Sequence, residues 1–209
     1  MQESGRIAIE ILAREVRKAS YTSNPVIDRE IIFPAVNGFM ATAALTGTTT
    51  TISLRYQGSG TVGGDATTRT CQGSEVPATS LAYETITVAN SVGIPLPELR
   101  CATSIVPIAG TPVISAAQAL VPNVEAINVL AGLDTTGDLQ PDEYVDPATV
   151  ADWSQVSSLN IQVRIVSADD LLVETPQAYR AFDGSMVTPN DRRLRRVYGS
   201  VVTLRNAIL

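Results

Sequence analysis

Apolar residues recur with the period of an α-helix over residues 1–21. Five of them share one face of this helix: Ala8, Ile11, Leu12, Val16 and Ala19. Four charged side chains take the other side: Glu10, Arg14, Arg17 and Lys18. Pro25 ends the pattern, because proline disfavours a helical backbone in the residue before it. The helix opens mid-pattern, so we expect the natural protein to continue upstream of Gln2.

A period of two replaces the helical pattern from residue 51. Residues 51–57 alternate strictly and place Ile52, Leu54 and Tyr56 on one face. Residues 159–165 alternate most clearly, as an antiparallel strand does when one face meets solvent. Four further segments are predicted strands: residues 83–89, 98–103, 124–131 and 197–204, with Ile127 and Val129 facing inward in the third. Residues 112–122 fit either a strand or a loop. One helix followed by many strands predicts an α+β domain.

The composition narrows the classes of function. The chain has 209 residues, of which 44% are hydrophobic, and this is enough for a single core. It contains no histidine, which excludes Ser-His-Asp and Cys-His catalysis and HExxH zinc sites. No other nucleophile–base pair stands out, so we expect no enzyme. The net charge of −6 argues against a nucleic-acid partner. No apolar run approaches the 18 or so residues that a membrane span requires.

Cys71 and Cys101 are the two cysteines of the chain. Their surroundings are rich in Thr, Asn and Gly, as in exported proteins, and this predicts one disulfide. Closing a loop of about 31 residues would stabilise the fold by roughly 3–4 kcal/mol. The alternative is a pair of buried free thiols in a cytosolic protein.

An acidic segment, residues 134–143, allows two interpretations. Five side chains could offer oxygen ligands to calcium: Asp134, Thr136, Asp138, Asp142 and Glu143. Thr136 and Leu139 break the EF-hand pattern, however. The alternative is an acidic hairpin turn, in which Gly137 supplies a positive φ and Asp134 caps the turn.

Three segments carry a resemblance to a known family. They are residues 2–19 (QESGRIAIEILAREVRKA), residues 132–165, which contain GLDTTGD followed by Tyr144 and Trp153, and residues 192–206, from RRLRRVY to the closing VTLRN. In this order and spacing they resemble the PilW family of type IV pilus minor pilins. The resemblance runs from end to end, but residues 25–120 contribute little to it beyond the cysteines.

The sequence departs from the family at three positions. Ser20 stands where the family usually has Gly after the helix, and Ala131 and Leu133 stand where it often has Tyr and Val. We expect these differences to affect packing rather than membership.

The resemblance implies a type IV pilin-like fold, with the N-terminal helix packed on antiparallel β-sheets. Residues 1–24 would be the C-terminal half of the pilin stem helix, and residues 25–209 a β-rich globular domain that forms one unit with it. Upstream, family members carry a leader, a methylated mature N-terminus and an apolar segment that anchors the subunit in the inner membrane before assembly. The assembled subunit would lie at the extracellular pilus tip of a Gram-negative bacterium.

The implied function is that of a minor pilin without a cofactor, unless calcium binds the acidic segment. It would promote pilus assembly and twitching motility together with other minor pilins and the major pilin. It would also present a tip adhesin for cell adhesion. Two alternatives remain open: a type II secretion pseudopilin and a calcium-dependent adhesin module.

Two groups of residues are candidates for the subunit interface. Ile7 and Ile9 are expected to project beyond the domain, exposed in a monomer and useful at an interface. The cationic group is Arg192, Arg193, Arg195 and Arg196. These arginines either pair with acidic residues of the same chain or face an acidic surface of a neighbouring pilin. DNA is a weaker alternative, because few aromatic residues are interleaved for stacking.

Overall fold

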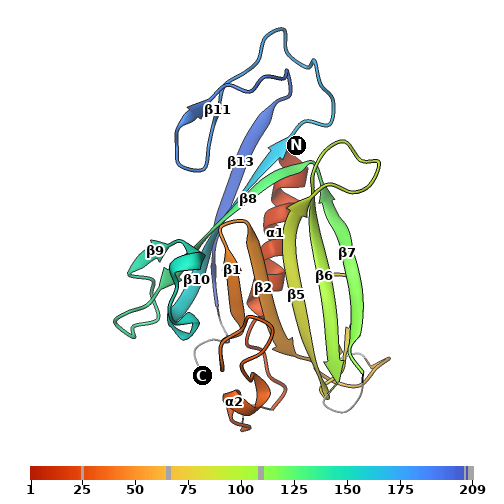
Figure 1. Cartoon of the computed structure of the whole chain (residues 1–209), viewed down its shortest axis with the longest axis vertical. Coiled ribbons are helices and arrows are strands. Elements are labelled where there is room, and N and C mark those ends of the chain that lie inside the picture. Colours follow the sequence, from red (N-terminus) through yellow and green to blue (C-terminus); the bar gives the residue numbers. More distant parts are fainter. Residues whose placement is uncertain (25, 65–66, 108–110, 205, 207–209) are drawn as a thin grey trace.

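An N-terminal helix lies against two antiparallel sheets in the computed structural model, which confirms the α+β class (Figure 1). The structure describes residues 1–24, 26–64, 67–107, 111–204 and 206. Pro25 and Arg205, which figured in the expected helix end and C-terminal motif, lie outside the described residues. Helical elements are α1 (Gln2–Lys18), α2 (Arg29–Ile32) and the short 3₁₀ turns η1 (Pro147–Thr149) and η2 (Trp153–Gln155).

Two main sheets divide the strands between them. The larger has the order β1-β2-β5-β6-β7 and the smaller the order β13-β10-β8-β9, and two short hairpins are separate. The larger sheet comprises β1 (Leu45–Thr48), β2 (Thr51–Gln57), β5 (Ser80–Ala89), β6 (Glu98–Pro107) and β7 (Val113–Pro122). The smaller comprises β8 (Val124–Leu133), β9 (Glu143–Val145), β10 (Val156–Val166) and β13 (Arg195–Thr203). The hairpins are β3 (Thr68–Arg69) with β4 (Glu75–Val76), and β11 (Tyr179–Arg180) with β12 (Met186–Val187).

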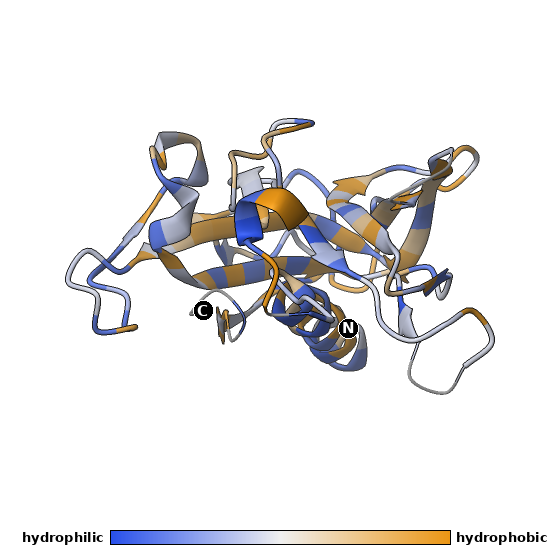
Figure 2. Cartoon of the chain, turned by 90° about the horizontal axis from the view of Figure 1, so that it is seen from below, coloured by the Kyte–Doolittle hydropathy of each residue, from blue (hydrophilic) through white to orange (hydrophobic). Residues whose placement is uncertain are grey.

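Helix α1 contacts both sheets, β10 and β13 of the smaller and β2 and β7 of the larger. Its predicted apolar face is buried at Ala8, Leu12, Val16 and Ala19, while Ile11 is half-buried. Figure 2 shows α1 against one side of the sheets, with hydrophobic and hydrophilic residues alternating along the strands. The amphipathic pattern therefore places the helix across the boundary between the sheets, where one apolar face serves both.

Gly5 allows α1 to approach β13 closely. A Cβ atom built on Gly5 would lie 2.3 Å from Cδ2 of Tyr198. Atoms at that distance overlap, so the ring of Tyr198 fits against the helix only because residue 5 has no side chain.

The predicted inward faces of the strands are confirmed. On β2, Ile52, Leu54 and Tyr56 are at most 1% exposed, and on β8 Ile127 and Val129 are 2% exposed. The opposite face of β2 is covered as well, because Arg55 is fully buried. Its guanidinium donates hydrogen bonds to backbone carbonyls of the segment that precedes β1: Phe33, Pro34, Met40 and Ala43.

The ambiguous segment 112–122 forms β7, an edge strand of the larger sheet. Its pairing with β6 shifts register between Leu99 and Arg100 and again between Cys101 and Thr103. Each β-bulge reverses which side chains face inward, which explains why the sequence shows no clear alternation there. The strand expected at residues 98–103 continues as far as Pro107.

Candidate functional site

The two cysteines form a disulfide that ties a loop to β6. The Sγ atoms of Cys71 and Cys101 are 1.99 Å apart, and Cys101 is fully buried. The backbone N–H of Cys71 also donates a 2.9 Å hydrogen bond to Oε1 of Glu84 on β5. The disulfide loop is therefore anchored to the core at two adjacent points.

A buried polar cluster joins α1 to the larger sheet beside this disulfide. Oε1 of Glu84 accepts hydrogen bonds from the hydroxyl of Tyr56 at 2.7 Å and from Nζ of Lys18 at 3.2 Å. Lys18 also forms an ion pair with Glu15, which is fully buried. Oε2 of Glu84 is buried without a hydrogen-bond partner among the described residues. Lys18 thus contacts two buried carboxylates, and Glu15 also pairs with Arg14 at 2.7 Å.

The cluster favours a protonated carboxyl group at Glu84. Burial raises its pKa to about 7; the charge of Lys18 opposes this shift, and the nearby Glu15 adds to it. Burial and the adjacent Glu84 also raise the pKa of Tyr56 far above its ordinary value. Protonation of Glu84 removes a charge that burial makes unfavourable.

The sequence contains a signal for this cluster, in acidic residues that stand at inward positions of α1 and β5. Glu15 lies three residues after Leu12 and four before Ala19, so it occupies the apolar face of α1. On β5, Glu84 falls between Ala82 and Ile86 on the inward face. An acidic residue at an inward position of each element indicates a buried polar contact between them.

The acidic segment forms a tight loop between β8 and β9. The carboxylate of Asp134 accepts hydrogen bonds from the backbone N–H of Gly137 at 2.6 Å and of Leu139 at 2.8 Å. Gly137 and Leu139 both have positive φ angles, 80° and 69°. Desolvation opposes the charged form of Asp134, but these backbone donors together lower its pKa. The arrangement is that of the expected acidic turn.

Asp142 closes the same loop from the other side. Its Oδ2 atom accepts bonds from the hydroxyl and the N–H of Thr135, both at 2.7 Å, and these bonds lower its pKa. The structure therefore uses oxygens of Asp134 and Asp142 for the loop itself. Among the described residues, the one group of three possible metal-binding side chains that converges is the disulfide pair with Glu84. Calcium binding by residues 134–143 stays an untested prediction, which calorimetric titration with Ca²⁺ can decide.

The four arginines of residues 192–196 differ in their contacts. The side chain of Arg195 is only 8% exposed and pairs with Glu125 at 2.8 Å and with Asp191 at 2.7 Å. The hydrogen bond from Arg195 lowers the pKa of Asp191 to about 2. Arg193 donates to the carbonyl of Ser167 at 2.8 Å. Both arginines are thus engaged within the chain, but only Arg195 pairs with acidic residues, as the self-pairing alternative expected.

The other two arginines are less constrained. Arg192 makes a long hydrogen bond of 3.5 Å to the carbonyl of Glu174. Arg196 is exposed, and its guanidinium carbon lies 5.5 Å from the ring centre of Tyr198. The run therefore offers Arg192 and Arg196, rather than all four side chains, to a partner.

The N-terminal turn of α1 is only partly as expected. Ile7 is 40% exposed, but Ile9 is half-buried and packs against the core. The prediction of two exposed isoleucines was wrong for Ile9, because α1 already lies against β13 at Gly5 and does not project beyond the domain. The acidic loop and the arginines lie at opposite ends of the smaller sheet, so the structure does not bring these candidate groups together.

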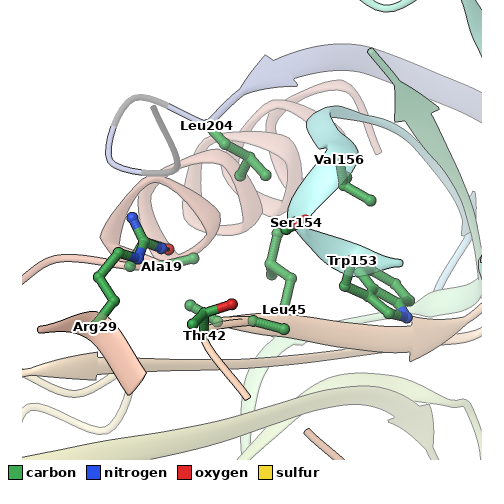
Figure 3. Close-up of a pocket in the computed structure, with 11 residues that line it drawn as sticks. Ala19, Arg29, Thr42, Leu45, Trp153, Ser154, Val156 and Leu204 are labelled. Carbon is green, nitrogen blue, oxygen red and sulfur yellow. Dashed lines mark hydrogen bonds between the residues drawn. The ribbon is translucent and has the colours of Figure 1, made fainter. Parts of the chain in front are cut away.

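A cavity of about 250 Å³ lies where the C-terminal end of α1 meets β1 and η2 (Figure 3). Arg29 borders it on one side and Trp153 on the other. The Arg29 guanidinium donates to the hydroxyl of Ser20 at 2.6 Å and to the carbonyl of Asn206 at 3.1 Å. Because ligand pockets usually enclose about 300–1,000 Å³, we assign no ligand to it.

Among the described residues, no helix is both long enough and apolar enough to cross a membrane. Comparison with known families matches residues 85–206, more than half of the chain, to the family described as Type IV Pilus-assembly protein W. Neither the curated proteins nor the solved structures gave a match.

Proposed function

The chain belongs to the PilW family of type IV pilus-assembly proteins, and we propose that it is a minor pilin at the pilus tip. In this role it is a structural subunit that promotes assembly and does not catalyse a reaction. Its partners would be other minor pilins and the major pilin, together with a tip adhesin. It would reside in the inner membrane and periplasm before assembly, and on the cell surface afterwards.

The observation that carries the proposal is the two-sided character of α1. One face is buried against both sheets, at Ala8, Leu12 and Val16. The other face carries exposed charges of both signs: Glu3, Arg6, Glu10, Arg14 and Arg17. A helix that is fixed to its domain along one face and open along the other can pack against the helix of a neighbouring subunit.

The exposed face offers both apolar area and charge for such a contact. Ile7 is 40% exposed in the single chain, and Arg6 and Glu10 flank it one and three residues away. An apolar centre with a charged rim is the usual composition of an interface between proteins. The Cys71–Cys101 disulfide would protect the domain outside the cell, where such bonds persist.

The proposal is tested by deleting the gene and measuring surface pili, twitching motility and type II secretion in the same strain. We expect loss or strong reduction of pili and twitching, normal secretion, and recovery with the intact gene. Normal piliation in the deletion strain would overturn the proposal. A secretion defect with normal pili would instead support a type II secretion pseudopilin.

A further inference from the structure

A groove of about 550 Å³ lies beneath the β11–β12 hairpin, on the face of the smaller sheet that points away from α1. Arg164 holds the hairpin over the sheet, because its guanidinium carbon lies 5.3 Å from the ring centre of Tyr179 and 5.4 Å from that of Phe182. The volume falls within the range of about 300–1,000 Å³ that is usual for ligand pockets. The hairpin and the sheet therefore form a concave surface between them.

One arginine that lines this groove has no carboxylate partner in the described part of the chain. The described lining residues include Arg180 and Arg195 but no carboxylate; Arg196 also borders the groove, but its guanidinium lies over Tyr198, on the α1 face of β13. Arg195 is neutralised by Glu125 and Asp191. Arg180 is exposed, and its only hydrogen bond among the described residues goes to a backbone carbonyl at 3.2 Å. An acidic group is the complementary occupant.

Apolar surface lies beside this charge. Phe182 and Val197 are half-buried in the groove, and Gly184 and Gly199 contribute no side chain that would fill it. A ligand that complements the groove would therefore carry an apolar side chain next to a carboxylate.

The acidic loop of the same chain has this chemistry. Leu139 is 50% exposed at the tip of the loop and has a φ of 69°, a conformation that is unfavourable for leucine. Its N–H bond to Asp134 holds it there. Asp138, the preceding residue, is exposed beside it. The loop thus presents an apolar side chain and a carboxylate in a fixed arrangement.

The loop cannot reach the groove of its own chain. At one end of β10, Val156 pairs with Leu133, which leads into the loop; at the other, Val166 pairs with Arg195. Strand β10 has 11 residues. At roughly 3.3 Å per residue this separates the two ends by about 35 Å. Figure 1 shows β9 and β11 at opposite ends of the sheet. The two features can meet only between two copies.

We propose that the groove beneath the β11–β12 hairpin receives the acidic loop of a second copy of this chain, with Leu139 against Phe182 and Val197 and Asp138 paired with Arg180. The contact is head to tail, so each copy retains one free loop and one free groove. Such a contact extends along one axis, as a filament does. Its place in a pilus rests on the proposed function, but the contact itself is a property of the purified protein.

Sedimentation of the purified protein at low salt tests this contact without pili. We expect concentration-dependent association that weakens as salt is added. Arg180→Gln and Asp138→Asn should each weaken it at least tenfold, and Leu139→Ser should do the same. The matched controls Arg69→Gln and Glu30→Gln remove the same charges at exposed positions outside both the groove and the helix face, and should leave it unchanged.

Mixing the variants tests the head-to-tail geometry. The Asp138→Asn chain keeps an intact groove and the Arg180→Gln chain keeps an intact loop, so an equimolar mixture should form a 1:1 complex and nothing larger. The proposal is overturned if the wild-type chain remains monomeric at every concentration. It is also overturned if the variants associate as the wild type does, or if the mixture associates no better than each variant alone.

Discussion

We expect a single carboxyl group, that of Glu84, to dominate the dependence of stability on pH above pH 5. The chain has no histidine, so few groups titrate between pH 5 and 8. The exception is Glu84, whose pKa burial raises from 4.5 to about 7. The pKa of Asp191 lies at about 2 and does not contribute in this interval.

We expect the native state to lose stability as the pH rises from about 5 to 8. Between pH 4.5 and 7 the folded protein keeps a proton on Glu84 that the unfolded chain releases. The free energy of unfolding therefore falls as the pH rises through this interval. The free energy of unfolding should fall by up to about 3 kcal/mol across this range. Urea unfolding at pH 5, 6, 7 and 8 measures it.

Glu84→Gln supplies the control for this prediction. Glutamine has the shape of the protonated carboxyl group but does not titrate, so the variant should show a flat profile. Glu30→Gln, at an exposed site, should retain the slope of the wild type. A wild-type profile that is flat, or that rises with pH, would contradict the assignment.

Gly5 offers a second test at the residue scale. Gly5→Ala should destabilise the protein by about 1–3 kcal/mol, because the added methyl group overlaps the ring of Tyr198. In a Tyr198→Ala background the same change should instead stabilise by up to about 1 kcal/mol, through helix propensity. Thermal melts of the four proteins give both values, and equal effects in the two backgrounds would refute the contact.

The structure explains why serine can stand at position 20, where the family usually has glycine. Its φ is 66°, in the left-handed region where glycine is favoured, and the family usually has Gly at this position. The hydroxyl of Ser20 accepts a hydrogen bond from Arg29, an interaction that glycine could not make. Serine therefore gives up the conformational freedom of glycine at this position, and its side chain gains a contact with Arg29.

At the scale of elements, regular patterns predicted the structure well. Alternation identified β2 at its observed bounds, Thr51–Gln57, and located most of the other long strands. It could not resolve β7, because two bulges break the period. It also could not show that residues 33–43 cover the outer side of Arg55, since that burial depends on how an irregular loop folds back over the strand.

The candidate site residues were predicted less completely. The cysteine pair and the acidic turn followed from local sequence. The cluster of Glu15, Lys18 and Glu84 did not, because it forms only when α1 docks on β5 and β2. The groove beneath the β11–β12 hairpin depends in the same way on a loop that folds back over its own sheet.

The disulfide links the loop at Cys71 to β6, and its contribution to stability can be tested directly. Replacing both cysteines, Cys71→Ala with Cys101→Ala, should lower the free energy of unfolding by roughly 3 kcal/mol, because the unfolded chain loses a constraint on its loop. Urea unfolding of the double variant and of the reduced wild type should agree. Unchanged stability in both would contradict a stabilising role for the bond.

At the scale of the whole molecule, the family match covers only the C-terminal part of the chain that the structure describes. The match begins at residue 85, within β5, and ends at residue 206. Helix α1 and the first strands lie before it. Their assignment to a pilin stem and domain is a proposal, which the packing of α1 across both sheets supports.

The molecule also has two dissimilar ends. The acidic loop lies at one end of the smaller sheet, and the arginines and the β11–β12 hairpin lie at the other. Subunits with complementary ends can stack along one direction. This polarity suits a protein that works within a filament.

The central claim is that the protein is a structural subunit of the pilus, and fractionation of sheared pili tests it most directly. Pili are sheared from the cell surface and collected, and the protein is detected with a specific antibody. The account predicts that it is recovered with the pili and is absent from the same fraction of a strain lacking the major pilin. Retention of all the protein in the cell envelope, or its release regardless of pili, would contradict the claim.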